Sequence, residues 1–323
     1  MTSLVDLSTD LAGLRLPNPL MTASGCAAAG RELHQFFDVA ELGAVVTKSV
    51  LRGVRSGRPT PRMAETPSGM LNSIGLQGPG IDGFLDHDLP WLRSVGARAV
   101  VSIAGGDVAE FRELAGRLAD QPGIAAVEVN ISCPNVANRG LVFACDPGAS
   151  SAVISAVRAE LPPSIPLLAK LSPDVTDIVE IAASCVAAGA DGLTMINTLL
   201  GISIDLDSMR PRLAGLTGGL SGPAIRPVAV RCVWQVYAAM RAGRLPHVPI
   251  VGVGGVRSGR DALELVLAGA SAVQVGTVTF NDPCAPIRVR DELAEELATR
   301  GIHRFADAVG HAHRVLAGEG ENR

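Results

Sequence analysis

The sequence predicts one α/β domain, a single (β/α)8 TIM barrel over residues 1–323 with insertions on its C-terminal face. Apolar runs recur eight times along the chain, and helix-like stretches follow most of them. Such alternation is typical of parallel strands joined by helical crossovers, and eight units can close into a barrel. The composition agrees, because 47% of the residues are hydrophobic but only 3% are aromatic, which suits aliphatic strands buried on both faces.

The apolar runs define the predicted strands. In chain order they lie near 18–23, 43–48, 99–103, 124–130, 166–171, 192–197, 248–253 and 272–276. The uneven intervals indicate insertions after the second, fourth and sixth strands, at 49–95, 131–149 and 198–224. All three follow C-terminal strand ends, where such barrels build their active sites.

Bulk properties argue against several classes of protein. The net charge of −4 gives no support for nucleic-acid binding. Residues 1–16 lack the apolar core of a signal peptide. The most apolar window, 262–280, contains Gly269-Ala270, which predicts a helix followed by a strand rather than a membrane span.

The cysteines and histidines predict no metal site. The six cysteines show no paired spacing, which is typical of reduced thiols in the cytoplasm. His311 and His313 are expected on the surface of a C-terminal helix. The arginines between Arg52 and Arg62 alternate with Gly and Pro and predict a solvated loop.

A polar motif, Asn130-Ile-Ser-Cys-Pro-Asn135, follows the fourth predicted strand. Each Asn offers both a donor and an acceptor, so the two can orient a flat polar ligand. The thiol of Cys133 can serve as a nucleophile or a general base. A buried structural cysteine between turn-forming asparagines is the alternative interpretation.

Lysine is almost absent from the sequence. Of 28 basic side chains only Lys48 and Lys170 are lysines, and each ends a predicted strand. A compact ammonium differs from a planar guanidinium in size and in its ability to lose a proton. The positions therefore favour a functional role for both lysines over chance retention on the surface.

Glycines follow the last two predicted strands, in Gly252-Val-Gly-Gly255 and at Gly276. Such barrels bind phosphate there with bare backbone N–H groups. Arg257 occupies the third glycine position of a dinucleotide fingerprint, so that motif is excluded, and a plain tight turn remains the alternative. A phosphate-anchored cofactor above a lysine suits FMN, whose reduced ring a positive charge at its N1–C2 edge would stabilise.

These motifs resemble class 1 dihydroorotate dehydrogenases, most closely the FMN-containing catalytic subunit of the 1B type. The resemblance covers nearly the whole chain. It rests on the stretches Asn72-Ser-Ile-Gly-Leu-Gln77, Asn130-Ile-Ser-Cys-Pro-Asn-Val136, Asn197-Thr-Leu-Leu-Gly201, Thr217-Gly-Gly-Leu-Ser-Gly-Pro-Ala224 and Gly269-Ala-Ser-Ala-Val-Gln-Val-Gly-Thr277.

The resemblance implies oxidation of (S)-dihydroorotate to orotate in pyrimidine biosynthesis. It implies that Cys133 removes the C5 proton, assisted by Lys48, while hydride passes from C6 to flavin N5. Substrate contacts are implied for Lys48, Asn72, Gly75, Leu76, Asn130, Asn135, Asn197 and Thr198. FMN contacts are implied for Ala23, Ser24, Lys48, Ser49, Asn130, Lys170, Ile196, Ser221, Gly222, Gly254, Gly255, Gly276 and Thr277.

The resemblance also implies a homodimer and a partner subunit with FAD and a [2Fe-2S] cluster that passes electrons to NAD. The sequence departs from the family at Gly78, where Asn is frequent, and at Cys145, where Thr is frequent. Neither is a predicted substrate contact. A fumarate-linked 1A-type enzyme, a related pyrimidine oxidoreductase, a Schiff-base aldolase acting through Lys170 and a non-catalytic barrel remain as alternatives.

Overall fold

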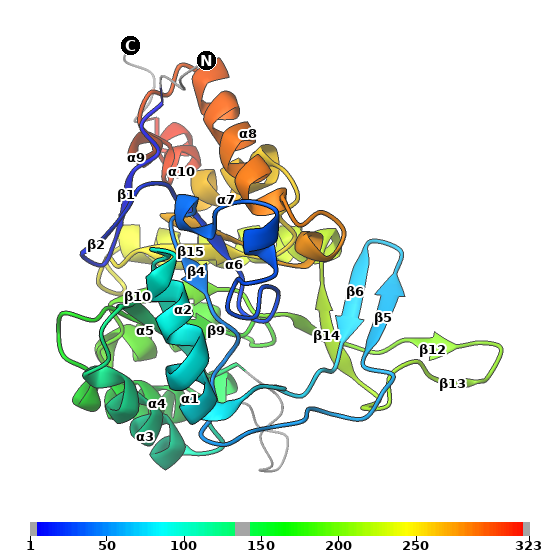
Figure 1. Ribbon diagram of the computed structural model, residues 1–323. Coiled ribbons are helices and arrows are strands. Elements are labelled where there is room, and N and C mark those ends of the chain that lie inside the picture. Colours follow the sequence, from blue (N-terminus) through cyan, green and yellow to red (C-terminus); the bar gives the residue numbers. More distant parts are fainter. Residues whose placement is uncertain (1–4, 133–142, 319–323) are drawn as a thin grey trace.

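The computed structural model describes residues 5–132 and 143–318, and the described residues form the predicted barrel (Figure 1). The eight parallel strands pair in the order β3-β16-β15-β10-β9-β8-β7-β4. A parallel bridge between Met21 and Ala44 joins the two end strands and closes the barrel. The strands are β3 (Leu20–Thr22), β4 (Val45–Val46), β7 (Ala99–Ile103), β8 (Ile124–Asn130), β9 (Leu167–Leu171), β10 (Gly192–Met195), β15 (Ile250–Val253) and β16 (Ala272–Val275).

Helices surround the barrel, and most of the barrel strands are followed by a helix, as predicted (Figure 1). The crossover helices are α3 (Val108–Ala119), α4 (Pro147–Glu160), α5 (Ile178–Ala187), α6 (Arg226–Arg241), α7 (Gly259–Ala268) and α8 (Ala285–Thr299). Between β4 and β7 the chain forms α1 (Gly80–Gly83), a π-helical turn (Phe84–Asp88) and α2 (Leu89–Ser94). Asp107, Asp146 and Asp177 accept a backbone N–H at the starts of α3, α4 and α5, which satisfies donors that a helix start leaves free.

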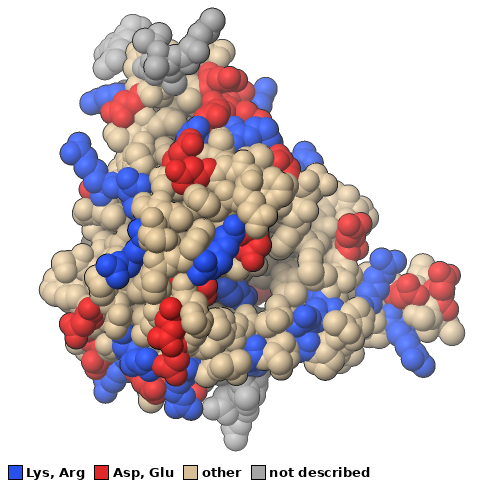
Figure 2. Space-filling view, in the orientation of Figure 1, with Lys and Arg blue, Asp and Glu red and all other residues tan. Residues whose placement is uncertain are grey.

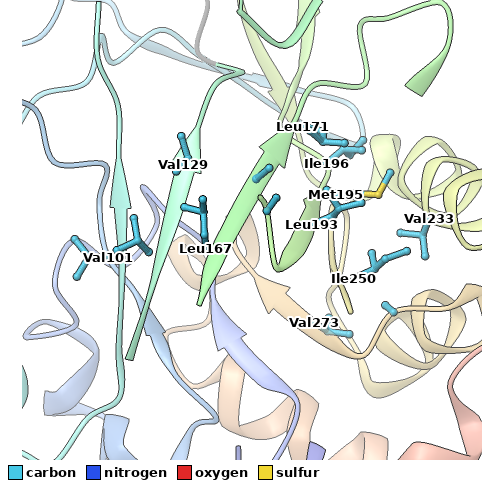
Figure 3. Close-up of a cluster of buried hydrophobic side chains, with 14 of the residues drawn as sticks. Val101, Val129, Leu167, Leu171, Leu193, Met195, Ile196, Val233, Ile250 and Val273 are labelled. Atoms are coloured by element: carbon cyan, nitrogen blue, oxygen red, sulfur yellow. The ribbon is translucent and has the colours of Figure 1, made fainter. Parts of the chain in front are cut away.

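Alternation along the strands divides the core into two layers. Val129, Leu193 and Ile250 belong to the layer packed under the helices, where Figure 3 shows Val233 of α6 facing Leu193 and Ile250. The alternate positions, such as Val100 and Leu168, form a separate cluster that fills the barrel.

Near the C-terminal end of the barrel the buried positions become polar. Glu128 of β8 and Lys170 of β9 are 0% and 3% exposed. Gln274 of β16 is also buried. Taking two charged groups out of water has a desolvation cost even when they form an ion pair, so this layer has a cost that an apolar core would avoid.

The insertions after β4 and β10 build a second sheet beside the barrel mouth. It is antiparallel and runs in the order β11-β14-β6-β5. Its strands are β5 (Met63–Thr66), β6 (Gly69–Asn72), β11 (Leu199–Gly201) and β14 (Gly218–Ser221). A hairpin of β12 (Ile204–Asp205) and β13 (Arg210–Pro211) projects from this side of the molecule (Figure 1). The insertions were predicted, but their pairing into one sheet was not.

The N-terminal hairpin of β1 (Thr9–Leu11) and β2 (Leu14–Leu16) lies on the same side of the barrel as α9 (Phe305–Ala308) and α10 (His311–Leu316) (Figure 1). As predicted, Gly269-Ala270 separates α7 from β16. Among the described residues no helix combines the length and apolar character of a membrane span. Figure 2 shows acidic and basic side chains interspersed over one face of the molecule.

The surface prediction for His313 is wrong. Its side chain is 6% exposed, and its ring stacks on Trp234 of α6 with a centroid distance of 3.6 Å. Its Nε2 lies 3.0 Å from the carbonyl oxygen of Ala268. The C-terminal helix α10 is thus attached to the barrel through a histidine that points inward.

Candidate active site

A large cavity opens where the C-terminal strand ends meet the second sheet, with a volume of about 1080 Å³. Every predicted site residue within the described ranges lines it. These are Ala23, Ser24, Lys48, Ser49, Asn72, Gly75, Leu76, Asn130, Lys170, Ile196, Asn197, Thr198, Ser221, Gly222, Gly254, Gly255, Gly276 and Thr277. Cys133 and Asn135 lie outside the described residues. Small-molecule sites span roughly 300–1,000 Å³, so this cavity has room for a cofactor together with a small substrate.

Lys170 lies on the floor of the cavity, held from two sides. Its Nζ donates to Ser24 Oγ at 2.9 Å and forms an ion pair with Glu128 Oε1 at 3.5 Å. The other carboxylate oxygen of Glu128 accepts a hydrogen bond from Gln274 Nε2 at 2.8 Å. The second contact of Lys170 is an ion pair without hydrogen-bond geometry, since Glu128 Oε1 has no hydrogen-bond partner among the described residues. The result is a fixed ammonium with a buried counter-charge.

Three strand-end side chains form a network around the hydroxyl of Ser132. This hydroxyl donates to Asn130 Oδ1 at 2.9 Å and accepts from Asn197 Nδ2 at 2.6 Å. Asn130 Nδ2 donates to Ser49 Oγ at 3.1 Å, and the backbone N–H of Thr198 donates to Asn197 Oδ1 at 2.9 Å. Asn197 Nδ2 also donates to Asn130 Oδ1 at 3.4 Å. Each carboxamide is therefore oriented at both its oxygen and its nitrogen, and Asn130 keeps one further N–H for a ligand.

Lys48 enters the cavity two residues after β4. Its backbone N–H donates to the carbonyl oxygen of Ala28 at 2.8 Å. A Cβ added to Gly25 would lie 3.4 Å from Lys48 Nζ, so the absence of a side chain at Gly25 keeps this ammonium accessible to the cavity. Both lysines of the sequence thus line the same cavity, as the strand-end positions predicted.

The second sheet supplies the opposite wall. Asn72 Nδ2 donates to the carbonyl oxygen of Gly219 at 3.3 Å. A Cβ at Gly219 would lie 2.1 Å from Thr198 Oγ1, so only glycine permits this close approach of β14 to Thr198. The pairing of β14 with β6 therefore brings Asn72 and Thr198 to one wall, although they are far apart in sequence.

Bare backbone lines the cavity after β15. Gly254 and Gly255 have φ values of 133° and 76°, which side chains rarely adopt. A Cβ at Gly255 would lie 2.9 Å from the backbone nitrogen of Arg226. At the start of α7 a capping box occupies the N–H groups of Ser258 and Asp261, and the N–H of Gly259 donates to Glu292 Oε2 at 2.7 Å. Across the cavity Thr277 Oγ1 donates to Ser221 Oγ at 2.8 Å.

These features fit FMN. Glycine backbone and hydroxyl groups suit a phosphate, and Lys170 supplies a positive charge deep in the cavity. Gln274 lines the cavity, and its Oε1 is a buried acceptor without a partner among the described residues. A flavin ring carries both an N–H group and carbonyl oxygens, so such a mixed donor and acceptor set complements it.

Several cavity residues were not predicted. Gln274 and Cys26 line it, and Glu128 lies directly behind Lys170. Burial raises the pKa of the Cys26 thiol, and the charges of Lys170 and Lys48 only partly oppose this effect. The sequence did contain one signal, since Glu128 is a lone charge inside an apolar run.

Arg58 at the cavity wall belongs to the arginine-containing loop that was predicted to be solvated. Its Nη1 donates to Ser73 Oγ at 3.0 Å, and its backbone N–H donates to the carbonyl oxygen of Ile74 at 2.9 Å. A Cβ at Gly75 would lie 2.8 Å from the Arg58 backbone nitrogen. For Arg58 the prediction was wrong in part, because this side chain is half-buried and supports the predicted substrate segment.

Comparison with known proteins gives a consistent result. The sequence profile of the family described as dihydroorotate dehydrogenase matches residues 6–297. The chain is 50% identical over 305 residues to the protein named "Dihydroorotate dehydrogenase B (NAD(+)), catalytic subunit" of Geotalea daltonii, covering 94% of this chain and 97% of that protein. The equally named protein of Pelobacter propionicus is 50% identical over 305 residues, with coverages of 94% and 98%.

The fold agrees with a solved structure. The DHODH of Eimeria tenella, crystallised in complex with ferulenol, superposes with a TM-score of 0.77 at 25% identity, covering 96% of this chain and 89% of that one. The barrel, the strand-end motifs and the extent of these matches lead to one conclusion: the chain belongs to the dihydroorotate dehydrogenase family, in its class 1B branch.

Proposed function

We propose that this chain oxidises (S)-dihydroorotate to orotate in pyrimidine biosynthesis, with FMN bound in the cavity as the hydride acceptor. The single observation that carries the proposal is the convergence of both lysines and three asparagines on one cavity. Dihydroorotate has a carboxylate, ring carbonyls and ring N–H groups, which an ammonium and carboxamides complement. The matching names of relatives at 50% identity support the same substrate.

In this proposal the chain's residues orient the substrate and move one proton. Lys48 binds the substrate near the reacting carbons, and Asn72, Asn130, Asn197 and Thr198 fix its ring. Cys133 follows Ser132 directly and is assigned the removal of the C5 proton. A thiol has an unperturbed pKa of roughly 8.5, so the assignment requires that the site favour the thiolate.

FMN supplies hydride acceptance at N5 when it is bound. Lys170 is assigned to the N1–C2 edge of the flavin ring, which carries the negative charge after reduction. Ser24 and Ser49 are assigned to further contacts with FMN. Gly254, Gly255, Gly276 and Thr277 are assigned to its phosphate. The fit rests on the open glycine cradle and on the buried ammonium.

We further propose that electrons leave through a partner subunit with FAD and a [2Fe-2S] cluster, and that the chain forms a homodimer at the centre of the complex. Support for a partner comes from the words "catalytic subunit" in the names of its relatives. A fumarate-linked enzyme without a partner is the competing proposal. NAD reduction by the chain with and without the partner separates the two.

The decisive experiment is an anaerobic titration of the purified, flavin-loaded chain with dihydroorotate, followed in the visible spectrum. Bleaching of the flavin band is expected. A band that stays oxidised would exclude dihydroorotate as the substrate, and a chain that binds no flavin would exclude the proposal as a whole. In parallel, Cys133→Ser should slow the bleaching by roughly 100-fold at neutral pH, the scale typical of a positioned base.

A further inference from the structure

Glu128 is a buried ionisable group that the proposed chemistry does not use. It is 0% exposed on the inner side of β8, next to Lys170 on β9. Its carboxylate is held by Gln274 through one oxygen, and its other oxygen lies 3.5 Å from Lys170 Nζ. A buried carboxylate that has no function adds a desolvation penalty to folding. The position of Glu128 beside Lys170, the more buried of the two lysines, therefore requires an explanation.

We propose that Glu128 is the counter-ion that keeps Lys170 protonated before the flavin is reduced, and that Gln274 positions Glu128 for this task. The inference rests on the proposed binding of FMN. Burial alone favours the neutral form of a lysine. Ser24, the direct hydrogen-bond partner of Lys170, is uncharged and can accept from either an ammonium or an amine. Glu128 is therefore the group that favours the ammonium.

The other charged or titratable groups around Lys170 do not replace Glu128. Lys48 carries a like charge, which opposes a second ammonium nearby. Cys26 remains a neutral thiol, because burial is the largest influence on it and raises its pKa. On the neighbouring strand β10, Thr194 is in register with Lys170 and is neutral. Among these described neighbours only Glu128 carries a negative charge.

The charge of Lys170 determines how many protons are taken up when the bound flavin is reduced. With Lys170 already charged, reduction of the bound flavin by two electrons takes up one proton, and the ammonium offsets the remaining negative charge. Without Glu128, burial of Lys170 favours the neutral amine in the oxidised protein. Reduction then takes up two protons, one of them bound from solvent by Lys170 Nζ when the ring gains its negative charge.

The test is the pH dependence of the flavin reduction potential in Glu128→Gln, measured with an electrode and mediator dyes. Gln has nearly the same shape and can still accept from Gln274. Each proton per electron pair contributes about 29.6 mV per pH unit. The wild-type slope should be about 30 mV per pH unit, and the slope of Glu128→Gln should double to about 59 mV where Lys170 is neutral.

Two controls separate charge from packing. Thr194→Val removes a buried hydroxyl that has no partner among the described residues, on the strand beside Lys170, and changes no charge. It should keep the wild-type slope. The double variant Glu128→Gln/Lys170→Gln should have the same slope as the single variant Lys170→Gln. Both variants lack Lys170 Nζ, which is the acceptor of the second proton.

Equal slopes in Glu128→Gln and in the wild type would overturn the inference and leave the proposed function intact. A two-proton slope in the wild type would overturn it as well. If Glu128→Gln binds flavin too weakly for electrochemistry, its flavin affinity should recover as the pH falls and Lys170 regains its proton. Loss of flavin at every pH would count against the inference, whereas a wild-type chain without flavin would instead refute the proposed function.

Discussion

The hydroxyl of Ser132 lies 2.6 Å from Nδ2 of Asn197 and so joins the ends of two barrel strands. The same hydroxyl donates to Asn130. Ser132 is buried and precedes Cys133 in the chain. One side chain thus sets which edge of each carboxamide faces the cavity.

Ser132→Ala should weaken orotate binding without loss of flavin. The change leaves Asn130 Oδ1 and Asn197 Nδ2 without this partner, at a cost of roughly 1–3 kcal/mol. If about half of that appears in binding, orotate affinity falls roughly two- to tenfold. Titration of the flavin-loaded protein with orotate measures the effect.

Ser150→Ala is the matched control for this prediction. Ser150 is also buried, and its hydroxyl donates to the carbonyl oxygen of Phe143 at 2.9 Å, but it does not line the cavity. This variant should lower stability and leave orotate affinity unchanged. Equal losses of affinity in both variants would show that general destabilisation, not carboxamide orientation, is responsible.

Lys170→Arg should reduce flavin affinity although it keeps the positive charge. Lys170 is 3% exposed between Ser24 and Glu128, and a planar guanidinium is larger than an ammonium. Overpacking costs roughly 1–3 kcal/mol, so we expect flavin to bind about tenfold more weakly. The flavin content after dialysis measures this loss of affinity. Arg231→Lys, a substitution at an exposed position, is the control. Full flavin retention in Lys170→Arg would contradict the argument from lysine rarity.

The barrel and its strand ends could be predicted because they follow from local sequence. Apolar runs identify strands, and parallel strands bring their C-terminal ends to one edge. Asn130, Lys170 and Gly254 were therefore predicted to meet. The cavity wall formed by β14 and β6 could not be predicted, because no local pattern encodes the pairing of Gly219 with Asn72.

The prediction for His313 was wrong and the role of Glu128 was missed, for different reasons. The stacking of His313 depends on Trp234, which lies on another helix. The sequence alone does not show that the two residues are close in space. Glu128 was visible as a charge in an apolar run, but its partner Gln274 lies on β16 and was recognisable only after the barrel had closed.

Gly219→Ala should destabilise the junction between β14 and Thr198. The added Cβ would lie 2.1 Å from Thr198 Oγ1 and 2.7 Å from Thr198 Cβ. Displacement of this side chain should cost about 1–3 kcal/mol, measured as a lower Tm, and should weaken orotate binding. In Gly53→Ala the new Cβ meets nothing within 4 Å, so this control should behave as wild type. An unchanged Tm in Gly219→Ala would show that the sheet can move away from Thr198.

The free energy of unfolding should decrease as the pH decreases, because His313 becomes protonated. Burial lowers the pKa of His313 from its ordinary 6.5, and the nearby Arg241 adds to this effect, while the hydrogen bond to Ala268 opposes it. The unfolded chain therefore binds the proton more readily than the folded one. The stabilising contribution is complete above pH 6.5 and is lost as the pH falls through the lowered folded value.

We expect the Tm to decrease as the pH falls below about 6.5, and His313→Phe to reduce the slope of that decrease. Phe can keep the stacking on Trp234 but carries no proton. His311→Phe, in the same helix, is the control, and it should retain the wild-type slope because His311 is more exposed. A slope that His313→Phe leaves unchanged would assign the acid sensitivity to other groups. A smaller slope confined to His313→Phe would show that protonation of this histidine weakens the attachment of α10 to the barrel.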